Sequence, residues 1–272
     1  MIYSIKKLQC KYPSKDNIVL DVESLKIDQG DIIFILGPSG VGKSTLLETL
    51  GLMTKTVYKA EEFSFHGQEN LITDLSTIWN KNEIDISNFR NDCLSFMFQS
   101  TNLFAHLTAF ENVIMPALMQ GLNEYIVVRK AKQLFDQFLP GEDYEKRVSE
   151  YSGGQRQRIA FIRAILADYI VLLADEPTGN LDANNADLLM KEIVSSIKKD
   201  NKTAIIVSHD IALSLKHATK IVLIDRQVNG GISKGSIKVD SLFVKNNDLW
   251  SNTEVTYDHN DMKQLMHKRL LS

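Results

Sequence analysis

Short apolar runs alternate along most of the chain with segments of helical periodicity. Residues 2–9 and 18–27 alternate apolar and polar positions and predict two strands joined by a turn at 13–17. Apolar runs predict buried strands at 31–36, 94–98, 169–174, 203–207 and 220–225. Helical spacing predicts helices at 44–52, 108–139 with a break near 121–123, 152–167, 184–199 and 210–217. This alternation predicts an α/β fold with a largely parallel sheet, helices on both faces and antiparallel strands at the N-terminus.

Three segments depart from the alternation. The mostly helical stretch 100–152 is expected to form an inserted subdomain. Residues 54–92 are polar and weakly patterned, so that only 62–66 has strand character and 73–88 receives no assignment. Residues 237–272 form a C-terminal extension with a helical pattern near its end, which is either a packed or fraying terminal helix or a partner-binding device. Its apolar helix face would consist of Met262, Leu265, Met266 and Leu270.

One run between a predicted strand and a predicted helix matches the phosphate-binding pattern G-x-x-x-x-G-K-[ST]. Small residues let several backbone N–H groups point at one phosphate chain, and the helix that follows adds its positive dipole end. Lys43 is placed to reach the β and γ phosphates, and Ser44 offers its hydroxyl to Mg²⁺. The run consists of Gly37, Pro38, Ser39, Gly40, Val41, Gly42, Lys43, Ser44 and Thr45.

Two acids follow the predicted strand 169–174. Ligands bind at the carboxyl ends of parallel strands, so Asp175 and Glu176 are expected beside the phosphate loop. Asp175 can hold Mg²⁺ through water, and Glu176 can polarise an attacking water as a general base. The alternative is a solvated acidic turn before Pro177, and the presence of the phosphate loop disfavours it.

A second anion site is predicted where Ser152, Gly153, Gly154 and Gln155 open a helix. One chain thus carries two phosphate-binding helix starts that lie far apart in the sequence. Two copies facing head to tail could pair each phosphate loop with the other copy's Ser-Gly-Gly site.

The composition and charge of the chain exclude some classes of protein. The chain has 272 residues, of which 44% are hydrophobic and 24% charged, with a formal net charge of -3. There is no global basic field for nucleic acid. Cys10 and Cys93 lack metal-ligand spacing and are interpreted as reduced thiols. No apolar run reaches the roughly 18 residues that cross a bilayer, and the N-terminus lacks a signal-peptide pattern. We therefore expect a protein on the cytoplasmic side of any membrane that it serves.

The motifs together resemble the nucleotide-binding subunit of ATP-binding cassette (ABC) transporters. The match covers roughly residues 1–230 and rests on GPSGVGKST, Gln99, SGGQRQR, VLLADEP, GNLD and His209, in the family's order. The resemblance implies a phosphate-loop NTPase core that hydrolyses ATP with Mg²⁺. It also implies a second ATPase subunit, with a homodimer permitted, and a separate integral-membrane permease on whose cytoplasmic face the chain would lie. Tyr151, where the family usually has Leu, is a departure that should preserve the site.

The resemblance assigns roles residue by residue. Tyr12 would stack on adenine, Gln99 would sense Mg²⁺ and the attacking water, and Glu176 would be the catalytic base. His209 would contact the γ-phosphate, and the segment with Asp182 would lie across the dimer interface. Ser152, Gly153, Gly154 and Gln155 would contact the γ-phosphate held by the opposite subunit.

The same resemblance predicts domain limits and a branch of the family. Residues 1–236 would form the ATPase domain. Residues 174–182, together with Leu103, 107–113 and Met115-Pro116, are similar to the branch of lipoprotein-releasing, macrolide-export and cell-division ATPases. Export or lipoprotein release is therefore expected, with cell-division-type signalling through a membrane partner as the alternative. A soluble nucleic-acid- or ribosome-associated ABC protein is disfavoured, since one cassette is present without heptads or a basic patch.

Overall fold

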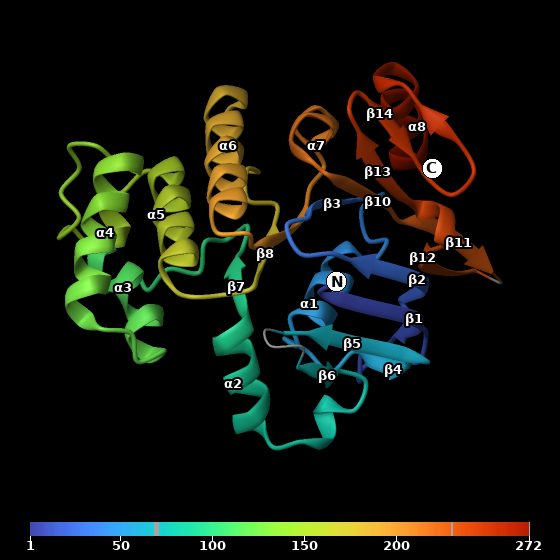
Figure 1. Cartoon of the computed structure of the whole chain (residues 1–272), viewed down its shortest axis with the longest axis horizontal. Helices are drawn as coiled ribbons and strands as arrows, with labels where there is room; N and C mark the ends of the chain where they lie inside the picture. Colours follow the sequence, from blue (N-terminus) through green and yellow to red (C-terminus); the bar gives the residue numbers. More distant parts are fainter. Residues whose placement is uncertain (68–70, 230, 272) are drawn as a thin grey trace.

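Two sheets organise the chain in the computed structural model, which describes residues 1–67, 71–229 and 231–271 (Figure 1). In the larger sheet the neighbours β7, β8, β9, β3 and β10 are parallel, and β13, β14 and β15 continue it antiparallel. The strands are β3 (Ile32–Leu36), β7 (Leu94–Met97), β8 (Val171–Asp175), β9 (Thr203–Val207), β10 (Lys220–Leu223), β13 (Leu242–Asn246), β14 (Leu249–Ser251) and β15 (Thr256–Tyr257). The predicted parallel sheet is thereby confirmed.

The smaller sheet contains the predicted N-terminal strands. Its order is β11-β12-β2-β1-β5-β6, with β4 also paired to β1, and only the pair β12–β2 is parallel. The strands are β1 (Tyr3–Cys10), β2 (Leu20–Ile27), β4 (Val57–Lys59), β5 (Glu62–His66), β6 (Ile72–Asp74), β11 (Asp225–Asn229) and β12 (Ile232–Ile237). Strands from segments far apart in the sequence, 3–74 and 225–237, therefore build one sheet.

Helices cover the larger sheet and form a lobe at one side of it (Figure 1). They are α1 (Lys43–Leu50), α2 (Glu83–Cys93), α3 (Ala109–Met119), α4 (Glu124–Phe138), α5 (Gly153–Leu166), α6 (Ala183–Lys199), α7 (Ile211–His217) and α8 (His259–Leu271). Single 3-10 turns are η2 (Ile78–Asn80), η3 (Val148–Glu150) and η4 (Val239–Ser241).

The core has three parts. Two of them lie on the two faces of β3, which is buried on both sides. Ile33 and Ile35 pack with α1 and the smaller sheet, whereas Phe34 packs with α5, α6, α7 and α8. A third apolar cluster joins α3, α4 and α5 in the helical lobe. Burial of both faces explains why the parallel strands read as continuous apolar runs in the sequence.

Several elements were not predicted from the sequence, among them β4, the hairpin of β11 and β12, and elements in two longer segments. Residues 73–88 hold the end of β6, η2 and the start of α2, which Asn82 caps by accepting a hydrogen bond from Asp85 N. Among the described residues of α2 only Ile86 is fully buried, and Phe89 and Cys93 pack against the same cluster, so the apolar stripe of this mostly polar helix is short. The C-terminal extension holds β13, β14 and β15 as well as a helix, and such short strands carry almost no periodicity.

The predicted terminal helix face is confirmed as packed. In α8 the side chains of Met262 and Met266 are fully buried, and Leu265 and Leu270 pack against the same apolar cluster. The extension thus closes one edge of the larger sheet (Figure 1).

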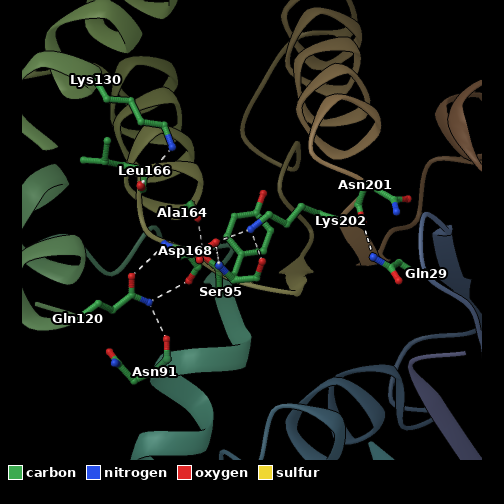
Figure 2. Close-up of polar contacts among 11 residues, drawn as sticks. Gln29, Asn91, Ser95, Gln120, Lys130, Ala164, Leu166, Asp168, Asn201 and Lys202 are labelled. Carbon is green, nitrogen blue, oxygen red and sulfur yellow. Dashed lines mark hydrogen bonds and ion pairs between the residues drawn. The ribbon is translucent and has the colours of Figure 1, made fainter. Parts of the chain in front are cut away.

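Polar contacts attach the helical lobe to the rest of the protein (Figure 2). At the end of α3, Gln120 Nε2 donates to Asn91 O at 2.6 Å and to Asp168 O at 2.8 Å, while its Oε1 accepts from Asp168 N at 2.9 Å. Lys202 Nζ donates to Asp168 Oδ1 at 2.6 Å and to Tyr169 O. One amide therefore joins α3, α2 and the loop between α5 and β8.

Candidate functional site

The phosphate loop runs from the end of β3 to the start of α1, as predicted. Gly40 and Gly42 have φ values of 73° and 106°, a left-handed conformation that glycine adopts at little cost. Gly42 is the N-cap of α1 and supplies no side-chain cap, so the first turn of α1 offers backbone N–H groups to an anion. Lys43 Nζ donates to Gly37 O at 2.8 Å and to Pro38 O at 2.9 Å, and this holds its charge inside the loop.

The carboxyl end of β8 lies beside the loop. Ser44 Oγ donates to Asp175 Oδ2 at 3.2 Å, which brings together two residues predicted as Mg²⁺ ligands. Burial raises the pKa of Asp175 above its ordinary value and lowers that of Lys43, although the two opposite charges partly offset this. Both groups are therefore held partly desolvated, where a charged ligand interacts with them strongly.

The two predicted catalytic residues touch each other. His209 Nε2 lies 2.7 Å from Glu176 Oε1. The contact follows from the sheet, because β8 and β9 are parallel neighbours, Asp175 pairs with Val207, and Glu176 N donates to Val207 O. Each residue follows the carboxyl end of its strand, so residues 33 positions apart in the sequence meet at one edge.

These residues border an open pocket of about 470 Å³. Tyr12 stands at its side, with its hydroxyl 3.1 Å from Thr45 Oγ1 and donating to Glu48 Oε2 at 2.9 Å, and Lys15 Nζ lies 5.4 Å from the centre of its ring. The lining residues are Tyr12, Ser14, Lys15, Val19, Ser39, Gly40, Gly42, Lys43, Ser44, Thr45, Glu176 and His209. The pocket therefore joins an aromatic wall to the phosphate loop and the acidic strand end.

Gln99 follows β7, the strand that pairs with β8. Asn180 Nδ2 donates to Gln99 O at 3.3 Å. A Cβ placed on Gly179 would lie 3.6 Å from Gln99 Nε2 and 3.7 Å from Glu176 Oε2, so the amide and the carboxylate flank the same glycine. Gln99 is thus near Glu176 but does not line the pocket.

The Ser-Gly-Gly-Gln segment forms a helix start outside this pocket. Ser152 Oγ accepts from Gln155 N at 3.3 Å, and Gln155 Oε1 accepts from Ser152 N at 2.8 Å, which is a capping box. Added Cβ atoms would meet nothing within 4 Å at Gly153 and only Leu181 at Gly154. Asp182 also caps a helix, by accepting from Asn184 N and Asn185 N at the start of α6. Neither 152–155 nor Asp182 contributes to the described lining of the pocket.

The residues present fit a nucleotide with Mg²⁺. Among residues 1–67, 71–229 and 231–271 there is no group of three His, Cys, Asp or Glu side chains that could hold a metal alone. Mg²⁺ in phosphate-transfer sites takes one or two protein oxygens and completes its shell with phosphate and water. The adjacent oxygens of Ser44 and Asp175 match that donor set.

Sequence reasoning missed several residues of this region. Ser14, Lys15 and Val19 line the pocket from the loop after Tyr12. Arg226 Nη2 donates to Ser39 O at 2.8 Å from β11. Proximity to Tyr12 could have indicated the first three, but nothing in the sequence indicates that Arg226 meets a loop nearly two hundred residues earlier.

Comparisons with known proteins agree with this geometry. The family model described as "ABC transporter" matches residues 20–179. The chain belongs to the ABC transporter family. It is 33% identical over 227 residues to the lipoprotein-releasing system ATP-binding protein LolD of Desulfotalea psychrophila, with 82% of this chain and 96% of that protein covered. The expected family is therefore confirmed, and with it ATP hydrolysis as the reaction of this ABC ATPase.

Two further comparisons concern the branch and the fold. The ABC ATPase is 32% identical over 240 residues to the macrolide export ATP-binding/permease protein MacB of Aggregatibacter actinomycetemcomitans, which covers 87% of this chain but only 35% of that protein. The dimeric ATP-binding cassette MJ0796, solved in a post-hydrolysis state with ADP and Pi, superposes with a TM-score of 0.70 at 26% identity, over 87% of this chain and 97% of that one. The predicted resemblance to the lipoprotein-releasing and macrolide-export branch is thus confirmed. Every helix in the described ranges is too short or too polar to span a bilayer.

Proposed function

We propose that this ABC ATPase is the motor subunit of a transporter, in which two copies close head to tail on ATP and drive a separate membrane permease. The observation that carries the proposal is the split between two anion sites. Residues of the phosphate loop, Glu176 and His209 line the pocket, and Asp175 accepts a hydrogen bond from the lining residue Ser44, whereas the helix start at 152–155 lies outside the pocket. A second copy that presents its own 152–155 segment would complete the pocket.

The pocket residues then have distinct roles. Lys43 and the N–H groups of the phosphate loop bind the β and γ phosphates, with Tyr12 against adenine. Ser44 and Asp175, together with Gln99 from outside the pocket lining, would hold Mg²⁺, whose charge would offset that of the phosphates. Glu176 accepts a proton from the attacking water, which it can do at hydrogen-bond distance.

The remaining predicted residues act at closure. His209 lines the pocket with its Nε2 2.7 Å from Glu176 Oε1, and it would contact the γ-phosphate and stabilise negative charge during transfer. Ser152, Gly153, Gly154 and Gln155 contact the γ-phosphate bound by the opposite subunit, and the segment with Asp182 lies across the interface. Positioning and charge neutralisation supply most of the catalysis in such a site.

A groove beside Gln99 is the place where the permease would dock. It has a volume of about 420 Å³ and is bordered by α2, α3 and α5, with Phe104, Met115 and Pro116 among its apolar residues. The Phe104 side chain is 58% exposed, so that its apolar surface at the groove is open to a partner. The relatives named as lipoprotein-releasing and macrolide-export proteins support export or lipoprotein release, on the cytoplasmic face of a membrane.

We also propose the domain limits predicted above. Residues 1–236 form the ATPase domain, 100–152 the inserted helical subdomain and 237–272 an extension. The break after 236 falls within β12, which pairs with β2, so the extension continues directly from the smaller sheet.

An affinity experiment tests the partner. Tagged Glu176→Gln protein with ATP should recover a polytopic membrane protein from detergent-solubilised membranes, and Phe104→Asp should abolish the recovery. Leu188→Asp is a matched control, because Leu188 is 55% exposed and lies on α6, away from the groove. Recovery of ribosomes or nucleic acid without a membrane protein would contradict the transporter proposal and leave the ATPase intact.

A further inference from the structure

The hairpin of β11 and β12 contacts the phosphate loop from behind. Arg226 Nη2 donates to Ser39 O at 2.8 Å, and its register partner on β12 is Gly235. The hairpin is anchored, because β12 is parallel to β2 with Gly235 opposite Leu20, and Gly235 N donates to Val19 O at 2.8 Å. Arg226 and Gly235 face each other across the hairpin. Arg226 is therefore bonded to the phosphate loop, and Gly235 is bonded to Val19 just before β2.

The backbone of Gly235 packs directly against the phosphate loop, which is possible because glycine has no side chain. A Cβ placed on Gly235 would lie 2.0 Å from Val41 O and 3.0 Å from Leu20 Cδ1. Real Cβ atoms do not approach a carbonyl oxygen so closely, so any other residue would displace the loop or the hairpin. Gly231, in the same hairpin, would meet nothing within 4 Å, which shows that the close approach is particular to Gly235.

These two contacts bear on the groups that would face the phosphates. In a trans peptide the C=O and the following N–H point in opposite directions. Holding Ser39 O toward Arg226 turns Gly40 N–H away from the hairpin, and holding Val41 O against Gly235 does the same for Gly42 N–H. Gly40 and Gly42 both line the nucleotide pocket. Their N–H directions are therefore set by the hairpin as well as by the loop itself.

The outer face of the hairpin is supported by the C-terminal helix. Arg269 Nη1 of α8 lies 3.2 Å from Asp225 Oδ2. Neighbouring residues of a strand point to opposite faces, which agrees with Asp225 meeting α8 while Arg226 meets the loop. Strand β11 thus contacts α8 through Asp225 and the phosphate loop through Arg226.

We propose that Arg226 and Gly235 are positioning residues for ATP, which orient the N–H groups of Gly40 and Gly42 toward the phosphates, and that α8 braces them through Arg269 and Asp225. The inference rests on the proposed role of the phosphate loop as the ATP site. It assigns the C-terminal extension an effect on nucleotide affinity.

Steady-state kinetics of the full chain test the proposal. Arg226→Met should raise the KM for MgATP on the order of fivefold, in keeping with the net contribution of one exposed hydrogen bond, with kcat changed less than about twofold. Arg226→Lys, which keeps a donor, should restore most of the affinity. Lys234→Met is the matched control, since Lys234 lies on the paired strand and binds Asp21 at 2.8 Å without touching the loop.

The outcomes separate this proposal from the one on which it rests. An unchanged KM in Arg226→Met, or an equal rise in Lys234→Met, overturns the positioning role, provided that Lys43→Ala still loses ATP binding. If Lys43→Ala binds ATP normally, the phosphate-loop assignment itself fails. Gly235→Ala should raise KM more than Arg226→Met does. If Gly235→Ala does not fold, the comparison of Arg226→Met with Arg226→Lys still tests the positioning role. Arg269→Met should raise KM by a smaller factor, and an unchanged KM there overturns the bracing by α8.

Discussion

Glu176 combines a strained backbone with the side chain proposed as the general base. Its φ of 46° lies in the left-handed region, which costs a non-glycine residue on the order of 1 kcal/mol. Immediately after β8 this conformation turns the chain, and the Glu176 carboxylate meets His209 at 2.7 Å. Strain of this kind persists where the surrounding structure holds it, as the hydrogen bond from Glu176 N to Val207 O does here.

Glu176→Gln tests the base at the residue scale. Glutamine keeps the shape of the side chain but accepts no proton, so ATP hydrolysis should fall by roughly 10²- to 10⁴-fold while ATP binding is retained. Phosphate release measures the first and equilibrium binding of ATP the second. A fully active Glu176→Gln enzyme would remove Glu176 from the base role.

Lys43→Ala tests the phosphate loop at the same scale. The lysine is 6% exposed and its removal takes away a positive charge and the donor to Gly37 O and Pro38 O. ATP affinity should fall by about 10- to 100-fold, as expected for loss of a charge-assisted hydrogen bond. Lys55→Ala, at an exposed lysine beyond α1, is the control and should bind ATP like the parent protein.

At the scale of elements, polar contacts attach the helical lobe to the rest of the protein. Gln120 at the end of α3 bonds to the backbone of Asn91 and Asp168, and Ser95 Oγ of β7 donates to Ala164 O of α5 at 2.7 Å (Figure 2). Because these contacts lie beside the groove proposed for the permease, they would carry movement of the partner into the sheet.

Gln120→Ala should weaken this attachment. Loss of three hydrogen bonds by one part-buried amide should lower the free energy of unfolding by about 1–2 kcal/mol. Denaturant unfolding measures the change. Gln133→Ala, at an exposed position on α4, is the matched control, and equal stability of the two variants would show that the Gln120 contacts contribute nothing.

Asp168 gives the attachment a pH dependence. The hydrogen bond from Lys202 lowers the pKa of Asp168 below its ordinary value of about 3.9. A carboxyl with a lowered folded pKa stabilises the protein above the unfolded pKa and ceases to do so as pH falls through the folded pKa.

The variant Asp168→Asn measures that contribution. The side chain is 72% exposed, so Asp168→Asn should cost less than about 1 kcal/mol at pH 7, and the difference from the parent should shrink below about pH 4. Urea unfolding at a series of pH values shows this directly. A difference that grows on acidification would contradict the role of the ion pair.

At the scale of the whole molecule, the pocket and the 152–155 helix start are separate surfaces of one chain. The family relative solved with ADP and Pi is a dimer, which fits the proposal that a second copy joins the two surfaces. An Asp at Gly153 would meet no neighbour near its Cβ, so Gly153→Asp should fold and block only the surface offered to the partner.

Mixing variants tests the head-to-tail arrangement. Gly153→Asp and Lys43→Ala should each be inactive alone, but an equal mixture should recover roughly a quarter of the parent activity, since half of the dimers are mixed and each has one intact site of two. Lys43→Ala mixed with Glu176→Gln is the control and should stay inactive, because both sites of that mixed dimer are damaged. No recovery in the first mixture would contradict the shared site.

The sequence by itself determined the elements whose signal is local. The phosphate loop follows from nine consecutive residues, and the buried strands follow from apolar runs, because a strand covered on both faces must be apolar throughout. Even the neighbourhood of Glu176 and His209 could be predicted, since carboxyl ends of parallel strands share one edge. The helix α2 and strands β11 to β15 could not be predicted, because α2 has only a short apolar stripe and the strands are too short for a clear period.

Only the tertiary structure decided which distant backbones touch. The bond from Arg226 to Ser39 O and the approach of Gly235 to Val41 O join residues almost two hundred positions apart. Such contacts depend on how two sheets and a hairpin pack. The identity of a single arginine or glycine in a strand does not predict which distant residue it contacts. Short local motifs in the sequence thus predict the chemical groups of the site, whereas the contacts that orient the backbone of the phosphate loop arise from tertiary packing.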